Sequence, residues 1–320
     1  MDARAWGMPR PGGCPRLSDA PARRMPAPGG CPGPACGPLG SPRATSDTRV
    51  MTSVSIRTVH DTAGFAAVAD YFSDVWQTPR SAPPLLPETL NSLAHAGGAV
   101  HAAYDAERVV GGCVAVFGPP AAREAYSLLA AAERGLGPRL KEAQRAWAVG
   151  LGARTMRWTF DPLVGRNARF NLVKLGAEGT GYLVDFYGPM ADGVNGGDES
   201  DRLEVTWDLT AARGRSTGTS ADGTAGTTAA REAAPVTHPA PDGGPLARRD
   251  PGDRYVWCRV PEDIVALRAT DAERALGWRR AVREVFTKAF AEGFTATGMS
   301  RDGWYTLTRR EDAPMEEDTL

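Results

Sequence analysis

Residues 124–160 read EAYSLLAAAERGLGPRLKEAQRAWAVGLGARTMRWTF, and this stretch determines the predicted fold. We predict a strand from Glu124 to Ala131, a glycine-rich turn, a helix from about Leu136 to Val149 and a second strand from Arg154 to Phe160. A crossover through a helix places its two strands in parallel in one sheet. The stretch therefore predicts an α/β fold that contains a parallel strand pair.

The turn in this stretch has the composition of an anion-binding loop, Arg134-Gly135-Leu136-Gly137. Glycines there let the backbone approach an anion closely, and the free amides and dipole of the following helix can hold a pyrophosphate. Pro138 suits the first helical position, and Arg134 and Arg139 add positive charge. The loop lacks the Gly-Lys-Ser/Thr of a Walker loop and the third glycine of a dinucleotide fingerprint. Taken alone, it is also typical of an ordinary tight turn.

Alternating apolar residues and helical stripes extend this pattern along the chain. Further strands are predicted at 54–59, 99–104, 108–117, 182–187, 203–209, 255–260, 294–299 and 304–308,. Further helices are predicted after Asp61, after Pro87, at 166–175 and at 271–292,. Together these elements predict a mixed, mostly antiparallel sheet with helices on both faces, followed by a C-terminal β-α-β-β extension.

Composition divides the chain into five segments, because runs rich in Pro, Gly, Ser and Thr cannot bury a core. They are a disordered head at 1–50, a first domain at 51–210, a flexible linker at 211–251, a C-terminal extension at 252–311 and an acidic tail at 312–320. The head contains no apolar periodicity, so Met51 is an alternative start to Met1. The stripe Ala275, Trp278, Val282, Val285, Phe286 and Ala289 predicts that the extension packs on the first domain,.

Charge and cysteine content narrow the class of protein. The formal net charge of -1 argues against a general nucleic-acid binder,. The longest strongly apolar run, 109–117, is far shorter than the roughly 20 residues that a membrane helix needs. Five unevenly placed cysteines do not form a disulfide framework, which favours reduced thiols in the cytoplasm,. The four histidines share no metal-ligand spacing, and we predict no metal site,.

The order of these elements resembles the GNAT superfamily of acyl-CoA-dependent N-acyltransferases. Within it, the strings Trp-Thr-Phe-Asp-Pro-Leu at 158–163 and Phe-Asn-Leu-Val-Lys-Leu-Gly-Ala at 170–177 resemble a poorly characterised branch of predicted acetyltransferases. The resemblance covers about residues 54–209 and resumes at 255–310. It implies that acetyl-CoA or another acyl-CoA is the co-substrate and that an amine of a small molecule attacks the thioester directly.

The same resemblance implies where the co-substrate binds. Its diphosphate would lie on the loop around Gly135, and its pantetheine arm would lie between the two parallel strands. The residues expected to contact it are Ala131, Glu133, Arg134, Gly135, Leu136, Gly137, Arg139 and Asn167.

Transfer to an amine needs a base for the nucleophile and an acid for the leaving thiolate. Glu124, Asp161 and Tyr187 are the catalytic candidates. Asp161 ends a predicted strand beside the proposed cleft, and Tyr187 ends the next. Each also has a structural explanation: a surface charge for Glu124, a turn before Pro162 for Asp161, and a half-buried strand residue for Tyr187.

Two alternatives to an active enzyme stay open at this point. Leu172 occupies the position where the superfamily often has a tyrosine general acid, and Ala132 occupies the usual Gln or Arg position of the loop. These departures favour a non-catalytic acyl-CoA-binding or partner-binding module, or a decayed copy that retains only the fold. A homodimer is also left open.

Overall fold

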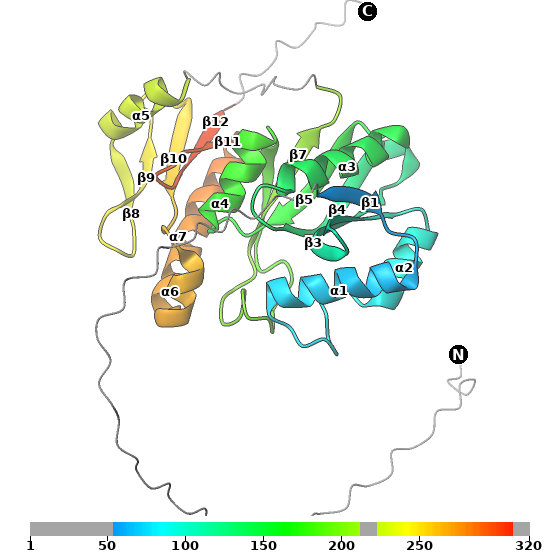
Figure 1. Ribbon diagram of the computed structural model, residues 1–320. Coiled ribbons are helices and arrows are strands. Elements are labelled where there is room, and N and C mark those ends of the chain that lie inside the picture. The colour runs from blue at the N-terminus through cyan, green and yellow to red at the C-terminus, as the bar shows by residue number, and fades with distance from the viewer. Residues whose placement is uncertain (1–53, 212–222, 310–320) are drawn as a thin grey trace, which may run out of the picture. The chain divides into compact units, whose positions relative to one another are not determined.

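The computed structural model describes residues 54–211 and 223–309 (Figure 1). The predicted disordered head at 1–50, the alternative start at Met51 and the acidic tail at 312–320 lie outside the described residues. None of the described helices combines the length and the apolar composition that crossing a membrane requires.

Twelve strands of the described residues form a single sheet in the order β1-β2-β3-β4-β5-β7-β6-β11-β12-β10-β9-β8. Their bounds are β1 Ser55–Thr58, β2 Ala99–Asp105, β3 Arg108–Phe117, β4 Glu124–Ala132, β5 Thr155–Phe160, β6 Glu178–Leu183, β7 Arg202–Asp208, β8 Val236–Pro239, β9 Pro245–Arg249, β10 Tyr255–Arg259, β11 Phe294–Met299 and β12 Trp304–Arg309. Only β4 and β5 pair in parallel among these strands. The predicted mixed, mostly antiparallel sheet is therefore confirmed.

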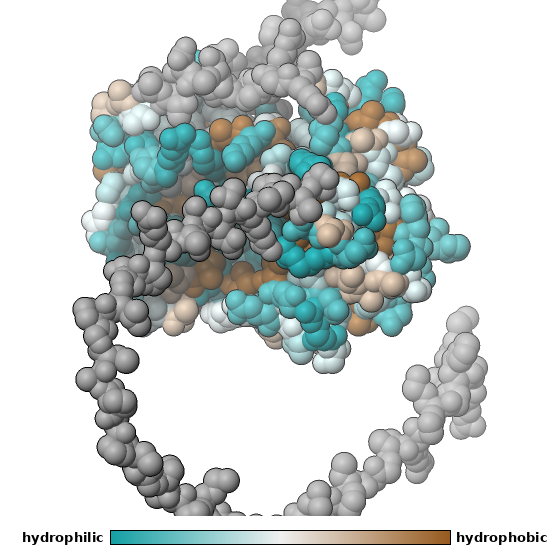
Figure 2. Space-filling view, viewed as in Figure 1, coloured by the Kyte–Doolittle hydropathy of each residue, from teal (hydrophilic) through white to brown (hydrophobic). Residues whose placement is uncertain are grey.

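Helices cover both faces of the sheet (Figure 1). Their bounds are α1 Thr62–Trp76, α2 Pro87–His95, α3 Gly137–Gly150, α4 Gly165–Ala168, α5 Gly223–Ala233, α6 Ile264–Thr270 and α7 Ala272–Ala291, with a 3-10 turn at Pro120–Ala122 and a π-helical turn at Arg169–Lys174. Neighbouring residues of β3 face opposite sides of the sheet. Val114 packs with α1 and α2 on one face, whereas Cys113 packs with Leu140 of α3 on the other. Hydrophilic residues cover much of the face seen in Figure 2, with apolar residues between them.

Local sequence explains where these helices begin. Asp61 caps α1 by accepting a hydrogen bond from the Gly64 amide at 2.8 Å,. Pro87 lies at the first position of α2, where its missing amide costs nothing,. Phe65, Val68, Ala69 and Phe72 form the buried stripe of α1,.

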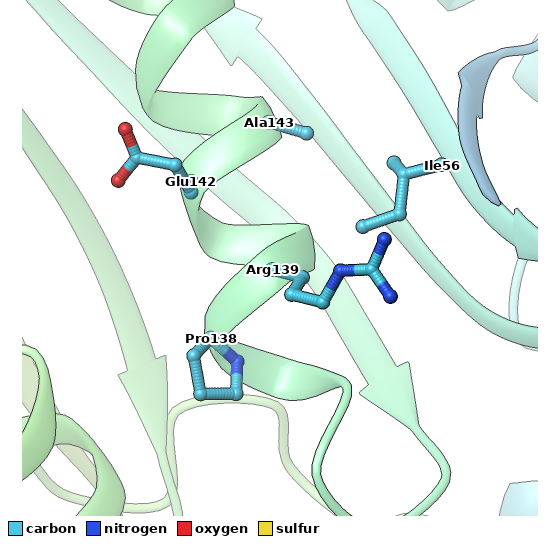
Figure 3. A pocket seen from close by; sticks show the side chains of 5 residues that line it. All are labelled: Ile56, Pro138, Arg139, Glu142 and Ala143. Carbon is cyan, nitrogen blue, oxygen red and sulfur yellow. The ribbon is translucent and has the colours of Figure 1, made fainter. Parts of the chain in front are cut away.

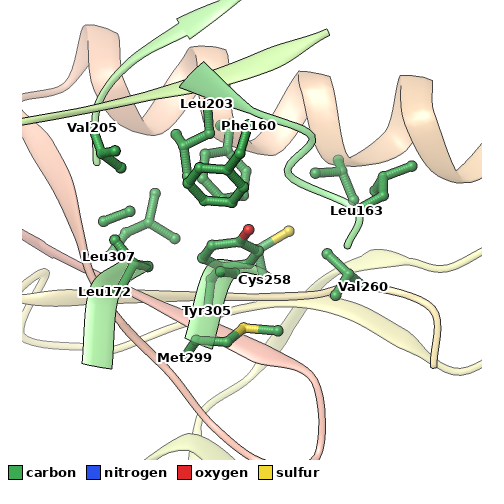
Figure 4. Packing of buried hydrophobic residues seen from close by; sticks show 14 of the residues in the cluster. Phe160, Leu163, Leu172, Leu203, Val205, Cys258, Val260, Met299, Tyr305 and Leu307 are labelled. Carbon is green, nitrogen blue, oxygen red and sulfur yellow. The ribbon is translucent and has the colours of Figure 1, made fainter. Parts of the chain in front are cut away.

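The C-terminal extension shares one hydrophobic core with the first domain. The predicted stripe of α7 is buried, and it packs in the same cluster as Leu203 of β7. Figure 4 shows Phe160 and Leu203 of the first domain facing Tyr305 and Cys258 of the extension. The phenol of Tyr305 donates a 2.7 Å hydrogen bond to the carbonyl of Pro162.

The extension also repeats the second half of the first domain. In the order β5-β7-β6, the middle strand is β7, which comes last of the three in the sequence. In the order β10-β12-β11, the middle strand is β12, which also comes last of its three. The helical segment before β6 is followed by Gly176 with φ +71°, and α7 is followed by Gly293 with φ +84°. The two halves meet where β6 and β11 pair antiparallel. We infer an approximate twofold relation between them.

The predicted linker at 211–251 is wrong over its second part. Residues 223–250 contain α5, β8 and β9, and β9 pairs with β10 from Ala247 to Arg249. Large apolar residues are few there, and composition therefore indicated a linker. The segment is ordered instead by backbone pairing and by buried small residues such as Ala234 and Ala247. Arg231 reinforces it, since its guanidinium lies over the Trp304 ring and pairs with Asp302 at 2.7 Å,.

A buried ionic network joins α6 and α7 to the first domain. The Asp161 carboxylate after β5 accepts from Arg279 at 2.7 Å, and Arg279 also binds Asp198 at 2.8 Å. Arg268 of α6 contacts both carboxylates. All four side chains are buried, so each charge depends on the others for compensation,.

Replacing Arg279 with Met should lower the free energy of unfolding by about 3–5 kcal/mol, because it leaves two buried carboxylates undercompensated. Urea denaturation followed by circular dichroism measures the change. Arg280, the next residue, has a side chain that is 62% exposed. The matched change Arg280→Met should therefore cost less than about 1 kcal/mol. Equal losses for the two variants would contradict a structural role for the network.

Candidate functional site

The two parallel strands, β4 and β5, separate along their length and form a fork. β4 and β5 pair at Glu124 with Thr155, Ala125 with Met156 and Tyr126 with Arg157. Beyond Tyr126, β4 follows β3 as far as Ala132, whereas beyond Arg157, β5 follows β7. The edges of β4 and β5 that face each other therefore have no strand partner past these pairs within the described residues.

A bulge in β4 lies just past the last pair of the fork. The register between β3 and β4 shifts from Val114 opposite Leu129 to Ala115 opposite Ser127, so Leu128 is the extra residue. A bulge bends its strand and increases the local twist. It thereby helps to turn β4 away from β5.

The predicted loop connects the open end of β4 to α3. Gly135 has φ +91°, a left-handed conformation that glycine adopts without strain,. No side chain caps α3, which begins at Gly137. The amides of Arg134, Gly135 and Gly137 donate to no backbone carbonyl among the described residues. These are the donors that a helix N-terminus offers to a phosphate.

The helical segment after β5 borders this loop. A Cβ added at Gly137 would lie 3.2 Å from the ring of Phe170, which is closer than carbon atoms normally approach. Asn167 lies one turn before Phe170 and is exposed,. Phe170 therefore packs this helical segment against the loop.

The side chains of two predicted contacts are engaged elsewhere. Glu133 pairs with Arg108 of β3 at 2.6 Å, and Arg139 donates to the carbonyl of Val54 at 2.8 Å. Figure 3 shows Arg139 extending toward Ile56. Both residues line an open depression of about 470 Å³, together with Pro138, Glu142 and Ala143. Ala131 and Leu136 pack against apolar clusters. The amides of Glu133, Leu136 and Arg139 also donate to backbone carbonyls, whereas the amides of Arg134, Gly135 and Gly137 donate to none among the described residues. The side chain of Arg134 is exposed.

Glu124 and Tyr187 lie on the sheet face opposite α3. Glu124 pairs with Arg157 at 2.7 Å, and Arg157 also approaches Glu204 of β7 at 3.6 Å. The Tyr187 hydroxyl lies 3.4 Å from the Thr159 hydroxyl. Tyr187 is not at the end of a strand, because β6 ends at Leu183 and Asp185 takes φ 45° in the turn that follows. The predicted strand at 182–187 is therefore shifted toward the N-terminus.

Asp161 has a different environment from the other two candidates. Burial alone would raise its pKa, but the charges and hydrogen bonds of Arg279 and Arg268 outweigh burial and hold that pKa well below its usual range. One oxygen also accepts from the Leu163 amide at 3.0 Å, as expected for a turn residue,. With its oxygens occupied, Asp161 is a poor proton acceptor, and we assign it a structural role.

Sequence reasoning missed Tyr126, which lies on the same face as Glu124 at the last pair of the fork. Strand alternation placed it two residues after Glu124 and so could have identified it. Burial is the largest influence on its pKa and raises it, despite a hydrogen bond with Thr159 that lowers it. Its phenol is therefore protonated at neutral pH.

A buried lysine on the opposite face was also missed. Lys141 of α3 donates to the Ser127 hydroxyl at 2.9 Å, and its ammonium lies 3.9 Å from the centre of the Trp158 ring. Burial lowers the pKa of Lys141 to about 7. The signal in the sequence was a lysine at an inward position of the helix, beside Leu140 and Gln144.

Within residues 54–211 and 223–309, no group of three or more His, Cys, Asp or Glu residues could hold a metal ion.

Comparison with known proteins gives similarity at the level of fold. Neither a family model nor a curated protein sequence matches the chain. An N-acetyltransferase from Staphylococcus aureus Mu50 is 15% identical, with 49% of this chain and 99% of that chain covered and a TM-score of 0.41. A putative acetyltransferase from Salmonella typhimurium, solved with its cofactor acetyl-CoA, is 15% identical over 50% of this chain and 96% of that chain, with a TM-score of 0.39. An aminoglycoside 6'-N-acetyltransferase from Enterococcus faecium is 14% identical over 49% and 98%, with a TM-score of 0.36.

The fold class follows from the chain's own topology and not from these scores. The strand order, the parallel pair that opens into a fork, the bulge in β4 and the glycine loop before α3 agree with the fold that the resemblance to the GNAT superfamily implies. The predicted fold is thereby confirmed, and the C-terminal half adds a second set of strands to it.

The low pKa of Lys141 has a measurable consequence for stability. Above pH 7 the folded state loses this proton, whereas the unfolded chain retains it until about pH 10.4,. The buried charge of Lys141 therefore destabilises the folded state fully below pH 7, and this destabilisation disappears as the pH rises. Between pH 7 and pH 9, the free energy of unfolding of the wild type should rise by about 2 kcal/mol more than that of Lys141→Met. Parallel urea-denaturation profiles of the two proteins would show that the lysine has an ordinary pKa.

Proposed function

We propose that this chain is an acyl-CoA-dependent N-acyltransferase that moves an acetyl or other acyl group to the amine of a small molecule. The observation that carries the proposal is the fork, whose unpaired strand edges lead to a loop with free amides at the start of α3. An extended arm with amide groups can pair with such edges, as a strand does. A diphosphate at its end suits the loop.

The residues of the face opposite α3 suit the transfer step. The nitrogen of the acceptor attacks the thioester carbonyl, a C–N bond forms and the C–S bond breaks. The nitrogen loses a proton to solvent, the departing thiolate gains one from a general acid, and solvent then reprotonates that acid. Tyr126, protonated and placed at the last pair of the fork, is proposed to donate the proton to the thiolate. Glu124 and Glu204, on either side of Arg157, are proposed to attract a cationic amine,.

Other parts of the proposal concern the setting of the enzyme. Cys113 and Cys258 are free and buried, which supports a reducing compartment such as the cytoplasm,. Small-molecule amines are preferred over nucleic acid as partners, because the net charge of the chain is -1,. The homodimer stays a prediction.

Two measurements test the function. Calorimetry with acetyl-CoA tests binding, and release of free thiol in the presence of amino acids, polyamines and aminoglycosides tests transfer. We expect binding and amine-dependent thiol release. Binding without release would favour the non-catalytic module, consistent with Leu172 being a buried residue at the position of the usual tyrosine. Absence of both would overturn the proposal.

Gly135→Val should weaken binding of the acyl-CoA by at least about tenfold, because the left-handed backbone at this position becomes strained and the loop amides reorient. The matched control is Gly243→Val in the β8–β9 turn, where φ is +83° and no atom lies within 4 Å of an added Cβ. That variant carries the same backbone strain and should bind as the wild type does. Equal affinity of both variants and the wild type would remove the loop from the site.

Tyr126→Phe should lower kcat by about 10²-fold, the usual contribution of a general acid, and leave the dissociation constant of the acyl-CoA unchanged. Steady-state thiol release and calorimetry separate the two effects. Tyr71→Phe is the control, since Tyr71 is also half-buried but belongs to α1. A Tyr126→Phe variant with wild-type kcat would assign the acid role to another group.

A further inference from the structure

The α3 side of the fork contains a buried group of polar side chains. Ser127 is the first residue of β4 past the last pair with β5, and Trp158 is the first residue of β5 past it. Lys141 contacts both, through a 2.9 Å hydrogen bond to Ser127 and a 3.9 Å approach to the Trp158 ring. Its ammonium therefore bridges the two strands at the point where they separate.

The hydrogen bonds of this group leave donors without acceptors. The Ser127 hydroxyl accepts from Lys141 and donates to Oε1 of Gln144 at 3.0 Å. Nε2 of Gln144 is buried without a hydrogen-bond partner. The indole N–H of Trp158 is already bound to Asn171 at 3.2 Å. The lysine and the glutamine thus present donors, and a ligand that completes the group must supply acceptors.

No counter-charge faces Lys141 in the described part of the chain. No carboxylate of the described residues forms an ion pair with it. The titratable group that acts on it is Cys113 of β3, which lies opposite His101 of β2. Burial lowers the pKa of His101 to about 4 and raises the pKa of Cys113 to about 12, so both are uncharged at neutral pH. A buried cation without a partner is costly, and an anionic ligand would relieve that cost.

We propose that Lys141 and Gln144 bind a carboxylate at the far end of the acyl group, so that this enzyme prefers a dicarboxylic acyl-CoA such as succinyl-CoA. The inference rests on the proposed function, because the thioester must lie in the fork for its acyl chain to reach Lys141. A carboxylate supplies both the negative charge and the two acceptor oxygens that this group lacks. An acetyl group supplies neither.

The proposal predicts a preference that calorimetry can measure. Wild-type protein should bind succinyl-CoA at least about tenfold more tightly than acetyl-CoA, as expected for hydrogen bonds to a charged group. Lys141→Met should bring the ratio close to unity by weakening succinyl-CoA alone. Lys288→Met, a change at an exposed lysine of α7, should retain the wild-type ratio.

Proton uptake gives a second measurement that needs no variant. At pH 8 the free amine of Lys141 is mostly neutral, because its pKa is about 7. A bound carboxylate favours the charged form, so succinyl-CoA should bind with uptake of about one proton. Acetyl-CoA should bind with little proton uptake. Calorimetry in two buffers of different ionisation enthalpy measures this difference.

The outcomes separate this inference from the proposed function. If neither thioester binds, the acyltransferase proposal fails and this inference fails with it. If both bind with equal affinity and equal proton uptake, the acyltransferase proposal stands and the carboxylate site is overturned. A preference for succinyl-CoA that persists in Lys141→Met would also overturn it, since another group would then recognise the carboxylate.

Discussion

Hydrogen bonding between β4 and β5 lasts for only three residue pairs, and the candidate site depends on this limit. Had the two strands continued together to Ala132 and Phe160, their facing edges would have been satisfied by each other. Instead, β4 stays with β3, β5 stays with β7, and the bulge at Leu128 bends β4 away. Unpaired backbone groups inside a protein need a partner. A fork of this kind is therefore suited to an extended ligand.

The two faces of the fork offer different chemistry because strand residues alternate in direction. Tyr126 and Glu124 lie on one face with Arg157, which is the face proposed for the proton transfers of the reaction,. Ser127 points to the other face, where Lys141 and Gln144 complete a buried polar group under α3. One residue along β4 thus separates the proposed chemistry from the proposed recognition of the acyl chain.

The C-terminal extension stabilises the site from a distance. Asp161 directly follows the strand that forms one side of the fork, and Arg279 and Arg268 of the extension fix its carboxylate. The repeated arrangement of strands, with β6 and β11 at the centre, lets the extension continue the sheet instead of covering it. Removal of the extension would expose buried carboxylates as well as an apolar surface, so the two halves form one cooperative unit.

Periodicity and turn chemistry in the sequence determined most of the strands and helices, the glycine loop and the docking stripe of α7, because these signals act over a few residues. Composition failed for residues 223–250, where order comes from pairing with β10 and not from large apolar side chains. The roles of Asp161 and Lys141 were decided only by the tertiary structure. Charge pairing and burial depend on residues that lie far apart in the chain: Arg279 follows Asp161 by 118 residues, yet the two share a buried salt bridge. A sequence read locally gives the type of each group, and only the folded chain gives its neighbours and hence its charge and its availability.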